Sequence, residues 1–321
     1  ETADSLERLL EYLGAGTTGY STAEPPVAVL MLDDCAVSGS PGDALFAKMT
    51  AEAAFVFDDA FWGLIPPQYG GAAVRAGWLS FKDQPRAVWP KDPNYLLFRK
   101  TLHRTHDRLC ADAGARTCAR WRASLFKGLE EAELQRLARA AVLDGLRRPF
   151  APLPAGDSPD DPAPAEARPA LRMVPEMKDL ARALLERGFD VWTFSLSGQH
   201  ASLEAARLYG LHPSRVVGLR NKILNGALTA ETLNPVPEGY GLAEGVALLV
   251  GRTPVLAVGR PQDAALLDTD DGDGLRVLLA PTGSPAAAAG RAKGWVVQPP
   301  LSPVREPQQP AAPKPAAPGA P

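Results

Sequence analysis

The feature that most constrains the fold is the distance along the chain between one short strand and the other predicted strands. The apolar run VAVLML at 27–32 ends directly in two aspartates, Asp33 and Asp34. Further apolar runs that alternate with helical patterns occur only after residue 170. Alternation of strands with helices is typical of a parallel sheet covered on both faces. The first strand is therefore expected to join strands that follow a long insertion.

The insertion has a helical pattern. Apolar residues recur at helical spacing through 93–112 and 130–147, and no convincing strand appears between residues 50 and 150. A stretch rich in proline, alanine and aspartate at 149–170 is typical of a linker or surface loop. The sequence thus predicts a helical domain between the first strand and the rest of the sheet.

After the insertion, the pattern predicts strands that are separated by helices. A short hairpin-like turn, LNGALT at 224–229, precedes the predicted helix at 241–251. An amphipathic helix is expected near the N-terminus, at 3–13, and the Pro/Ala-rich tail from residue 298 is expected to be disordered. The predicted strands are 190–197, 215–220, 254–259 and 275–281.

Composition excludes two classes of function. The 321 residues carry a net charge of −3 with acids and bases interspersed, whereas a nucleic-acid-binding protein would be expected to present a basic face. No apolar run approaches the ~18 residues needed to cross a bilayer. We therefore expect no nucleic-acid partner and no transmembrane segment, and the sequence does not indicate an oligomeric state.

The layout and four motifs resemble the haloacid dehalogenase (HAD) superfamily, in particular its phosphoserine-phosphatase-like branch, over residues 25–290. The resemblance implies an α/β fold: a HAD-like Rossmannoid parallel sheet with an inserted helical cap. The motif stretches are VAVLMLDDCAVSGSPGDALFAKM, VPEMKDLARALLERGFDVWTFSLSGQH, RVVGLRNKILNGALT and GRTPVLAVGRPQDAALL. The implied domains are core residues 1–43, cap and linker 44–168, core residues 169–297 and tail 298–321.

The resemblance also implies phosphoryl transfer through an aspartyl phosphate, in which a second aspartate two residues later acts as the acid and base. When the motif is anchored on GDALF, the nucleophile position falls on Met31 and the acid/base position on Asp33, with Asp34 next to it. The alternative register makes Asp33 the nucleophile, but Cys35 then takes the second carboxylate position. In either register the pair of acids is incomplete, which favours an inactive enzyme.

The other motifs are preserved unequally. Ser195 stands where the family places its phosphate-holding hydroxyl, and Ser197 follows it. At the expected lysine position the chain has Leu242, and Lys222 is the nearby candidate substitute. In the last motif, which should supply metal-binding acids, Arg260 replaces the first acid and Asp263 remains. A cation at Arg260 would repel Mg²⁺, or could replace it as an anion-binding charge that pairs with Asp33 or a phosphate.

Three functional hypotheses follow. The first is a catalytically inactive phosphatase homologue that binds a small phosphorylated or anionic ligand through Ser195, Ser197, Arg260 and Lys222. The second is an active Mg²⁺-dependent phosphomonoesterase that uses Asp33 in the shifted register, with Asp33 and Asp263 on the metal. The third is a non-enzymatic interaction or scaffold protein. The first hypothesis needs no cofactor.

The cysteines and histidines leave further alternatives open. Cys110 and Cys118 could pair across a short loop, which would suggest an oxidising compartment, or could remain free thiols. Cys35 is a weak nucleophile candidate. His103 and His106 are spaced as a possible metal pair on one helix face, without a third ligand at matching spacing. The start at Glu1 and the Pro/Ala-rich tail favour the cell envelope or secretion over the cytoplasm as an expectation.

Overall fold

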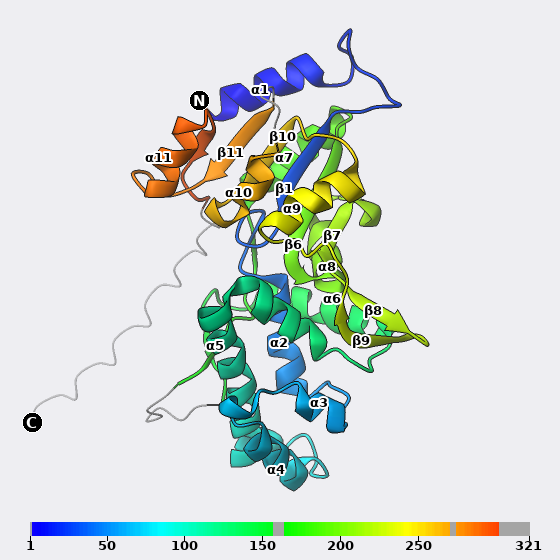
Figure 1. The fold of residues 1–321 in the computed structure, drawn as a ribbon, viewed down its shortest axis with the longest axis vertical. Coiled ribbons are helices and arrows are strands. Elements are labelled where there is room, and N and C mark those ends of the chain that lie inside the picture. The colour runs from blue at the N-terminus through cyan, green and yellow to red at the C-terminus, as the bar shows by residue number, and fades with distance from the viewer. Residues whose placement is uncertain (1, 157–163, 270–273, 302–321) are drawn as a thin grey trace, which may run out of the picture.

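The computed structural model describes residues 2–156, 164–269 and 274–301. Its centre is a six-stranded sheet in which every neighbouring pair is parallel. The order across the sheet is β12-β11-β10-β1-β6-β7 (Figure 1). The strands are β1 (Val27–Met31), β6 (Asp190–Gly198), β7 (Val216–Leu219), β10 (Leu256–Gly259), β11 (Leu275–Leu279) and β12 (Val296–Gln298).

This order is that of a doubly wound sheet, and it confirms the predicted α/β fold class. Numbered along the chain, the strands run 3-2-1-4-5-6 across the sheet, so the winding direction reverses between β1 and β10. Ligands of such sheets bind beyond the carboxyl ends of the strands at this reversal. The segments that leave β1, β6 and β10 are therefore where a functional site is expected.

Helices cover the sheet and share one hydrophobic core with it. β1 is buried along its whole length, as its uninterrupted apolar sequence predicts for a central parallel strand. The amphipathic helix α1 packs its leucines against the same core. The helices of this part are α1 (Thr2–Leu13), α7 (Pro175–Glu186), α8 (Gln199–Ala206), α9 (Tyr240–Gly245), α10 (Ala264–Leu267) and α11 (Pro285–Ala292).

The insertion builds a second hydrophobic core, rich in phenylalanine and tryptophan, as the helical pattern predicts. Figure 1 shows it beyond the end of the sheet, and the hairpin of β8 (Asn221–Leu224) and β9 (Ala227–Thr232) lies beside it. The helices of the insertion are α2 (Pro41–Glu52), α3 (Asp59–Gly63), α4 (Gly71–Phe81), α5 (Pro93–Ser124) and α6 (Glu131–Arg147).

The remaining elements are short. Strands β2 and β5 form one antiparallel pair, and β3 and β4 form another. None of the helices in the described part of the chain is long and apolar enough to cross a membrane. The elements are β2 (Val37–Ser38), β3 (Leu153–Pro154), β4 (Glu166–Ala167), β5 (Arg172–Met173), η1 (Pro67–Tyr69), η2 (Trp89–Lys91), η3 (Arg207–Tyr209), η4 (Pro213–Arg215), the π-helical turn η5 (Val246–Val250) and η6 (Pro261–Asp263).

Two elements differ from the sequence expectation. Helix α5 continues past residue 112 to Ser124, with a break at Gly114, where φ is 83°. Strand β12 ends at Gln298, the residue at which the predicted tail begins, and Leu301 still packs against the core. Most of the predicted tail, residues 302–321, lies outside the described residues. The domain boundaries at residues 44 and 168 stay a prediction.

Candidate functional site

The site begins with Asp33, just after β1. Its carboxylate is buried, with 7% of the residue exposed. Oδ2 accepts hydrogen bonds from the Ser195 hydroxyl at 2.5 Å and the Leu196 amide at 3.0 Å, and Oδ1 accepts one from the Ser197 hydroxyl at 2.5 Å. All three donors lie at the end of β6. The carboxylate is thereby held by three hydrogen bonds from one neighbouring strand.

Ser197 links this carboxylate to the start of helix α2. Its Oγ accepts a hydrogen bond from the Gly42 amide at 2.8 Å and lies 3.0 Å from the Ser40 Oγ. Ser40 is the N-cap of α2 and accepts from the Asp43 amide. A side chain at Gly42 would place Cβ 2.4 Å from Arg122 Nη2 and 2.9 Å from Ser197 Oγ. Gly42 therefore permits a guanidinium of the insertion to approach the serine cluster.

Met31 occupies the last position of β1, where the family resemblance places the nucleophile. The residue is 2% exposed. Its Cγ lies 3.4 Å from the position that a Cβ on Gly259 would take, and the Asp263 side chain lies beside the same position. A thioether therefore fills the space between the ends of β1 and β10. It cannot form an acyl phosphate, because it has no carboxylate oxygen.

Arg260 connects the loops that follow β1 and β10. Its backbone N–H and Nε donate to Asp263 Oδ2 at 2.9 and 3.3 Å, and its Nη1 donates to Asp34 Oδ2 at 3.1 Å. Burial alone would lower the pKa of Arg260, but Asp263, Asp34 and Asp33 outweigh it and raise that pKa. Burial raises the pKa of Asp263, against the opposing effect of Arg260. Arg260 thus pairs with Asp34 and Asp263, and not with Asp33 as one sequence hypothesis suggested.

The residues at this site do not fit the Mg²⁺ that the family resemblance implies. Magnesium requires near-octahedral oxygen ligands. Met31 offers a thioether, and both Asp33 oxygens already accept hydrogen bonds from the end of β6. The Arg260 guanidinium ties Asp34 to Asp263, so the position between these two acids already holds a fixed positive charge. A divalent cation would have to displace that guanidinium.

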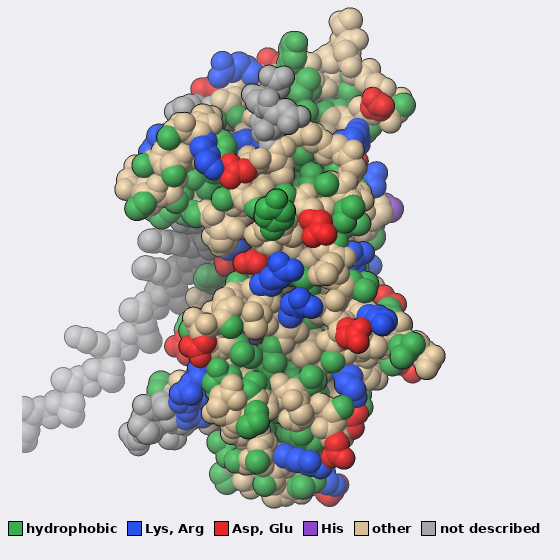
Figure 2. Space-filling model, viewed as in Figure 1, with side chains coloured by type: hydrophobic (Ala, Val, Ile, Leu, Met, Phe, Trp, Pro, Cys, Tyr) green, Lys and Arg blue, Asp and Glu red, His purple; other side chains and the backbone are tan. Residues whose placement is uncertain are grey.

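A cavity of about 260 Å³ opens beside these residues, between the strand ends and the insertion. Arg122 of α5 lines it and is ion-paired with Asp43 of α2, with only 6% of Arg122 exposed. A second cavity of about 310 Å³ shares Asp34, Ser40 and Asp43 with the first and adds Phe150. In Figure 2, acidic and basic side chains lie together where the sheet part meets the insertion. The two cavities form one charged cleft.

Arg122 and Asp43 were missed by the sequence reasoning. Asp43 lies in the GDALF motif, which served only to set the register. Arg122 lies beyond the predicted end of its helix, and nothing in its local sequence distinguishes it from the other arginines of the insertion. Its role depends on the packing of α5 against α2, which the helical pattern does not specify.

Lys222 is placed elsewhere by the structure. It lies on β8, its side chain is 54% exposed, and its Nζ pairs with Glu231 at 3.3 Å. It is not among the described residues that line either cavity of the cleft. A strand pair that projects from the sheet carries it away from β1, so the structure does not bring this predicted ligand-binding residue to the site.

The cysteines and histidines also take definite positions. Cys110 and Cys118 form a disulfide, so the free-thiol alternative is wrong for this pair. Cys35 is 2% exposed, and burial raises the pKa of its thiol, which makes it a poor nucleophile. His103 is buried with its Nε2 at 2.9 Å from Thr50 Oγ1, so it does not form a metal pair with His106.

No family model matches the chain, and no curated protein matches it. Among solved structures, a conserved protein of unknown function from Anaerococcus prevotii is 19% identical with a TM-score of 0.76, covering 91% of this chain and 88% of that one. A protein of unknown function from Bordetella pertussis is 14% identical with a TM-score of 0.50, covering 84% of this chain and 96% of that one. A probable phosphoserine phosphatase from Vibrio cholerae is 14% identical with a TM-score of 0.44, covering 88% of this chain and 63% of that one.

At these identities the comparisons show a shared fold and assign no activity. The class of protein is thus defined by architecture: an α/β protein with a Rossmann-like, doubly wound parallel sheet and a helical insertion after the first strand. This is the fold that the four sequence motifs predicted.

Proposed function

We propose that this chain is a HAD-fold protein that does not carry out phosphoryl transfer and instead binds a small ligand in the cleft between sheet and insertion. The observation that carries the proposal is the state of the Asp33 carboxylate. Both of its oxygens accept hydrogen bonds from Ser195, Ser197 and the Leu196 amide. A nucleophile must instead direct a lone pair at the substrate, and here three of the roughly four lone-pair positions of the carboxylate already accept hydrogen bonds.

The shifted-register phosphatase is disfavoured by the group that would assist Asp33. In that register Cys35 holds the acid/base position. Cys35 is buried, and its thiol pKa is raised by burial first and then by neighbouring Asp263. A thiol held in its neutral form by these surroundings cannot exchange a proton efficiently near neutral pH. The reaction would therefore lack its proton donor as well as a fitting metal site.

The charged side chains that line the cleft indicate what charge its ligand carries. Five carboxylates and two guanidinium groups line the cavity next to Asp33. Arg122 and Arg260 supply the positive charges that would hold a phosphate or carboxylate group. The excess of carboxylates opposes a ligand with several negative charges. We infer a small ligand with one anionic group at the arginines and a cationic or neutral remainder.

The disulfide supports the proposal of an oxidising compartment. Disulfides persist in oxidising environments, and Cys110–Cys118 is fully formed in the insertion. This bond supports the cell envelope or secretion over the cytoplasm. The scaffold hypothesis rests mainly on the tail, which lies largely outside the described residues, and no feature of the described part favours it.

Isothermal titration calorimetry with phosphoethanolamine, which carries both charges, tests the proposal. We expect saturable binding that is at least about 10-fold weaker in Arg260→Gln and Arg122→Gln, each of which loses a charge-assisted contact of about 1.5–3 kcal/mol. Lys222→Gln, which changes a lysine far from the cleft, serves as the matched control and should bind as the wild type does. Equal binding by all four proteins would place the ligand site elsewhere.

A further inference from the structure

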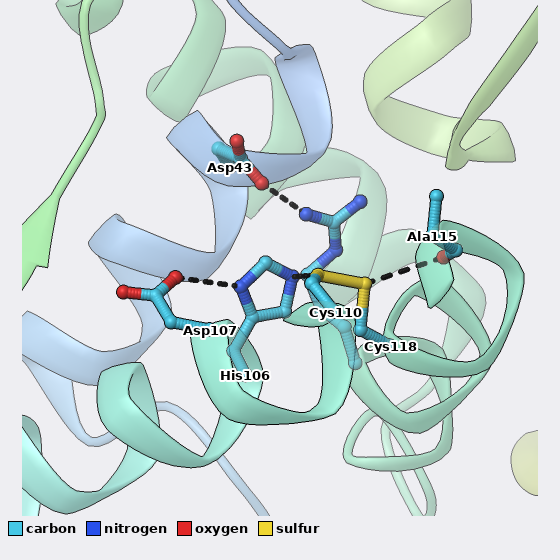
Figure 3. Close-up of a disulfide and its surroundings, with 7 residues drawn as sticks. Asp43, His106, Asp107, Cys110, Ala115 and Cys118 are labelled. Carbon is cyan, nitrogen blue, oxygen red and sulfur yellow. Dashed lines mark hydrogen bonds and ion pairs between the residues drawn. A yellow bond between two sulfur atoms is a disulfide. The ribbon is translucent and has the colours of Figure 1, made fainter. Parts of the chain in front are cut away.

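The wall of the cleft contains a cluster that the proposed function does not use. Helix α5 breaks at Gly114, and the chain turns back so that Cys110 and Cys118 come within 4.9 Å at their Cα atoms. His106 lies one turn before Cys110 on the same helix, with its Nε2 3.7 Å from Cys110 Sγ (Figure 3). All three side chains line the cavity next to Asp33.

The three side chains have the chemistry of a metal site. The ligand atoms of His106, Cys110 and Cys118 all lie within 4.8 Å of one another. A tetrahedral zinc ion with bonds of about 2.3 Å to sulfur and about 2.0 Å to nitrogen separates such ligands by about 3.5–3.8 Å. The observed sulfur–nitrogen distance of 3.7 Å already falls in that range. The two sulfurs, which are bonded to each other, must move apart, and Cys118 Sγ, which lies within 4.8 Å of His106 Nε2, must take its place at the same ion.

The surroundings of His106 match a metal-binding imidazole. Its Nδ1 lies 3.4 Å from Asp107 Oδ1, and Figure 3 shows the carboxylate on the side of the ring away from the sulfurs. A carboxylate at Nδ1 holds the proton there and leaves Nε2 as the ligand.

We propose that His106, Cys110 and Cys118 form a binding site for a thiophilic divalent cation such as Zn²⁺, available when the disulfide is reduced. Three protein ligands at the wall of the cavity leave a fourth position open toward the cleft, as in zinc sites that keep an exchangeable ligand. Disulfide and metal exclude each other, so the redox state decides which one the insertion carries. This site is independent of the ligand proposed above.

The chemistry balances in two steps. A dithiol reductant gives two electrons and two protons to the disulfide, so that the sulfur–sulfur bond breaks, two thiols form and the reductant becomes a disulfide. A phosphine does the same in vitro: its phosphorus gives two electrons to the disulfide and takes up the oxygen of water as the phosphine oxide, and the two water protons pass to the sulfurs. The cation then replaces the two thiol protons, which pass to solvent.

The test uses the full chain and Co²⁺ as a spectroscopic probe for zinc. The protein is reduced with a phosphine, freed of it by anaerobic gel filtration and titrated with Co²⁺. We expect one ion per chain, with thiolate-to-cobalt charge-transfer absorption that Zn²⁺ abolishes. The oxidised protein and the Cys110→Ser/Cys118→Ser double variant should show no such absorption. Cys35→Ala, which removes the buried cysteine, is the matched control and should behave as the wild type does.

His106→Ala tests the third ligand without touching the disulfide, and we expect its reduced form to bind Co²⁺ at least about 10-fold more weakly. Far-ultraviolet circular dichroism follows the helices throughout. Reduced wild type without charge-transfer absorption would overturn the proposal, whether or not its helices persist. Equal Co²⁺ affinity in His106→Ala would also overturn the three-ligand site.

Discussion

At the residue scale, the end of β1 differs from the motif that the family resemblance implies, yet the strand remains the buried centre of the sheet. Met31 completes the buried strand as an apolar side chain. Asp33, just after the strand, accepts hydrogen bonds from the two serines and so joins the end of β1 to β6. Both residues therefore contribute to packing and to local order, in line with the proposal that neither acts as a nucleophile.

The position of the Arg122 guanidinium depends on the absence of a side chain at Gly42. In Gly42→Ala, the new Cβ would overlap Arg122 Nη2 and Ser197 Oγ, so Arg122 must move away from the serine cluster. We expect a loss of about 1–3 kcal/mol in the free energy of unfolding, together with weaker ligand binding. Urea unfolding and calorimetry measure both effects.

Gly63→Ala is the matched control for that variant. A Cβ at Gly63, the last residue of α3, has no neighbour within 4 Å. Its stability should lie within about 0.5 kcal/mol of the wild type. Gly42→Ala could instead prove as stable as Gly63→Ala and bind the ligand as the wild type does. The close approach of Arg122 to Ser197 would then contribute neither to stability nor to ligand binding.

His103 makes stability depend on pH. Burial, together with the nearby charges of Arg99 and His106, lowers the pKa of His103 to about 3 from an ordinary value of 6.5. His103 is therefore protonated at a higher pH in the unfolded chain than in the folded state. The stability that depends on neutral His103 is fully present above pH 6.5 and is lost as the pH falls toward 3. Between pH 7 and pH 5 we expect His103 to remove about 2 kcal/mol from the free energy of unfolding.

The difference between urea unfolding at pH 7 and at pH 5 measures this effect. His103→Gln, which cannot titrate, should lose less stability over that interval than the wild type. His212→Gln removes an exposed histidine and should keep the wild-type pH dependence. An unchanged pH dependence in His103→Gln would show that other groups cause the loss.

At the element scale, local pattern predicted the strands and most helices, because buried parallel strands have long apolar runs. The predicted strand at 190–197 corresponds to β6, and the one at 254–259 contains β10. The predicted helix at 93–112 ends two residues before the break at Gly114, and what was missed is the second helical stretch from the break to Ser124. Strand β12 was missed because it is three residues long and only partly buried.

The contact between α6 and the chain that returns to the sheet gives an element-scale prediction. A Cβ on Gly145 would lie 2.5 Å from the backbone oxygen of Pro169, and the Leu171 N–H donates to Gly145 O at 3.0 Å. Because backbone cannot move aside as a side chain does, Gly145→Ala should lose about 1–3 kcal/mol of stability. Thermal or urea unfolding measures the loss.

Gly77→Ala in helix α4 is the comparison. A Cβ there would make ordinary contacts, at 3.6 Å and beyond, in the middle of a helix. Alanine is a better helix former than glycine by about 0.8–1.0 kcal/mol, so this variant should be unchanged or more stable. Equal losses in the two variants would show that the return segment does not pack tightly against α6.

At the scale of the whole molecule, the sequence predicted the architecture better than the site. The parallel sheet and the helical insertion after its first strand were predicted from four motifs in the right sequence order, whereas the order of the strands was not predicted. Asp33 and Ser195 were found through the family resemblance, and the structure brings them together because parallel strands place their carboxyl ends at one edge of the sheet. Arg122 could not be found, because its place depends on how the insertion packs against α2. Lys222 was misplaced because its strand pair projects away from the sheet.

The central proposal also concerns the whole molecule: the chain keeps the fold of a phosphatase but does not catalyse phosphoryl transfer. The most direct test is hydrolysis of p-nitrophenyl phosphate with and without Mg²⁺ by the wild type and by Asp33→Asn, which keeps the size of the side chain. We predict that neither protein exceeds the background rate and that Mg²⁺ changes nothing. Mg²⁺-dependent turnover by the wild type that Asp33→Asn abolishes would contradict the claim and make Asp33 a working nucleophile.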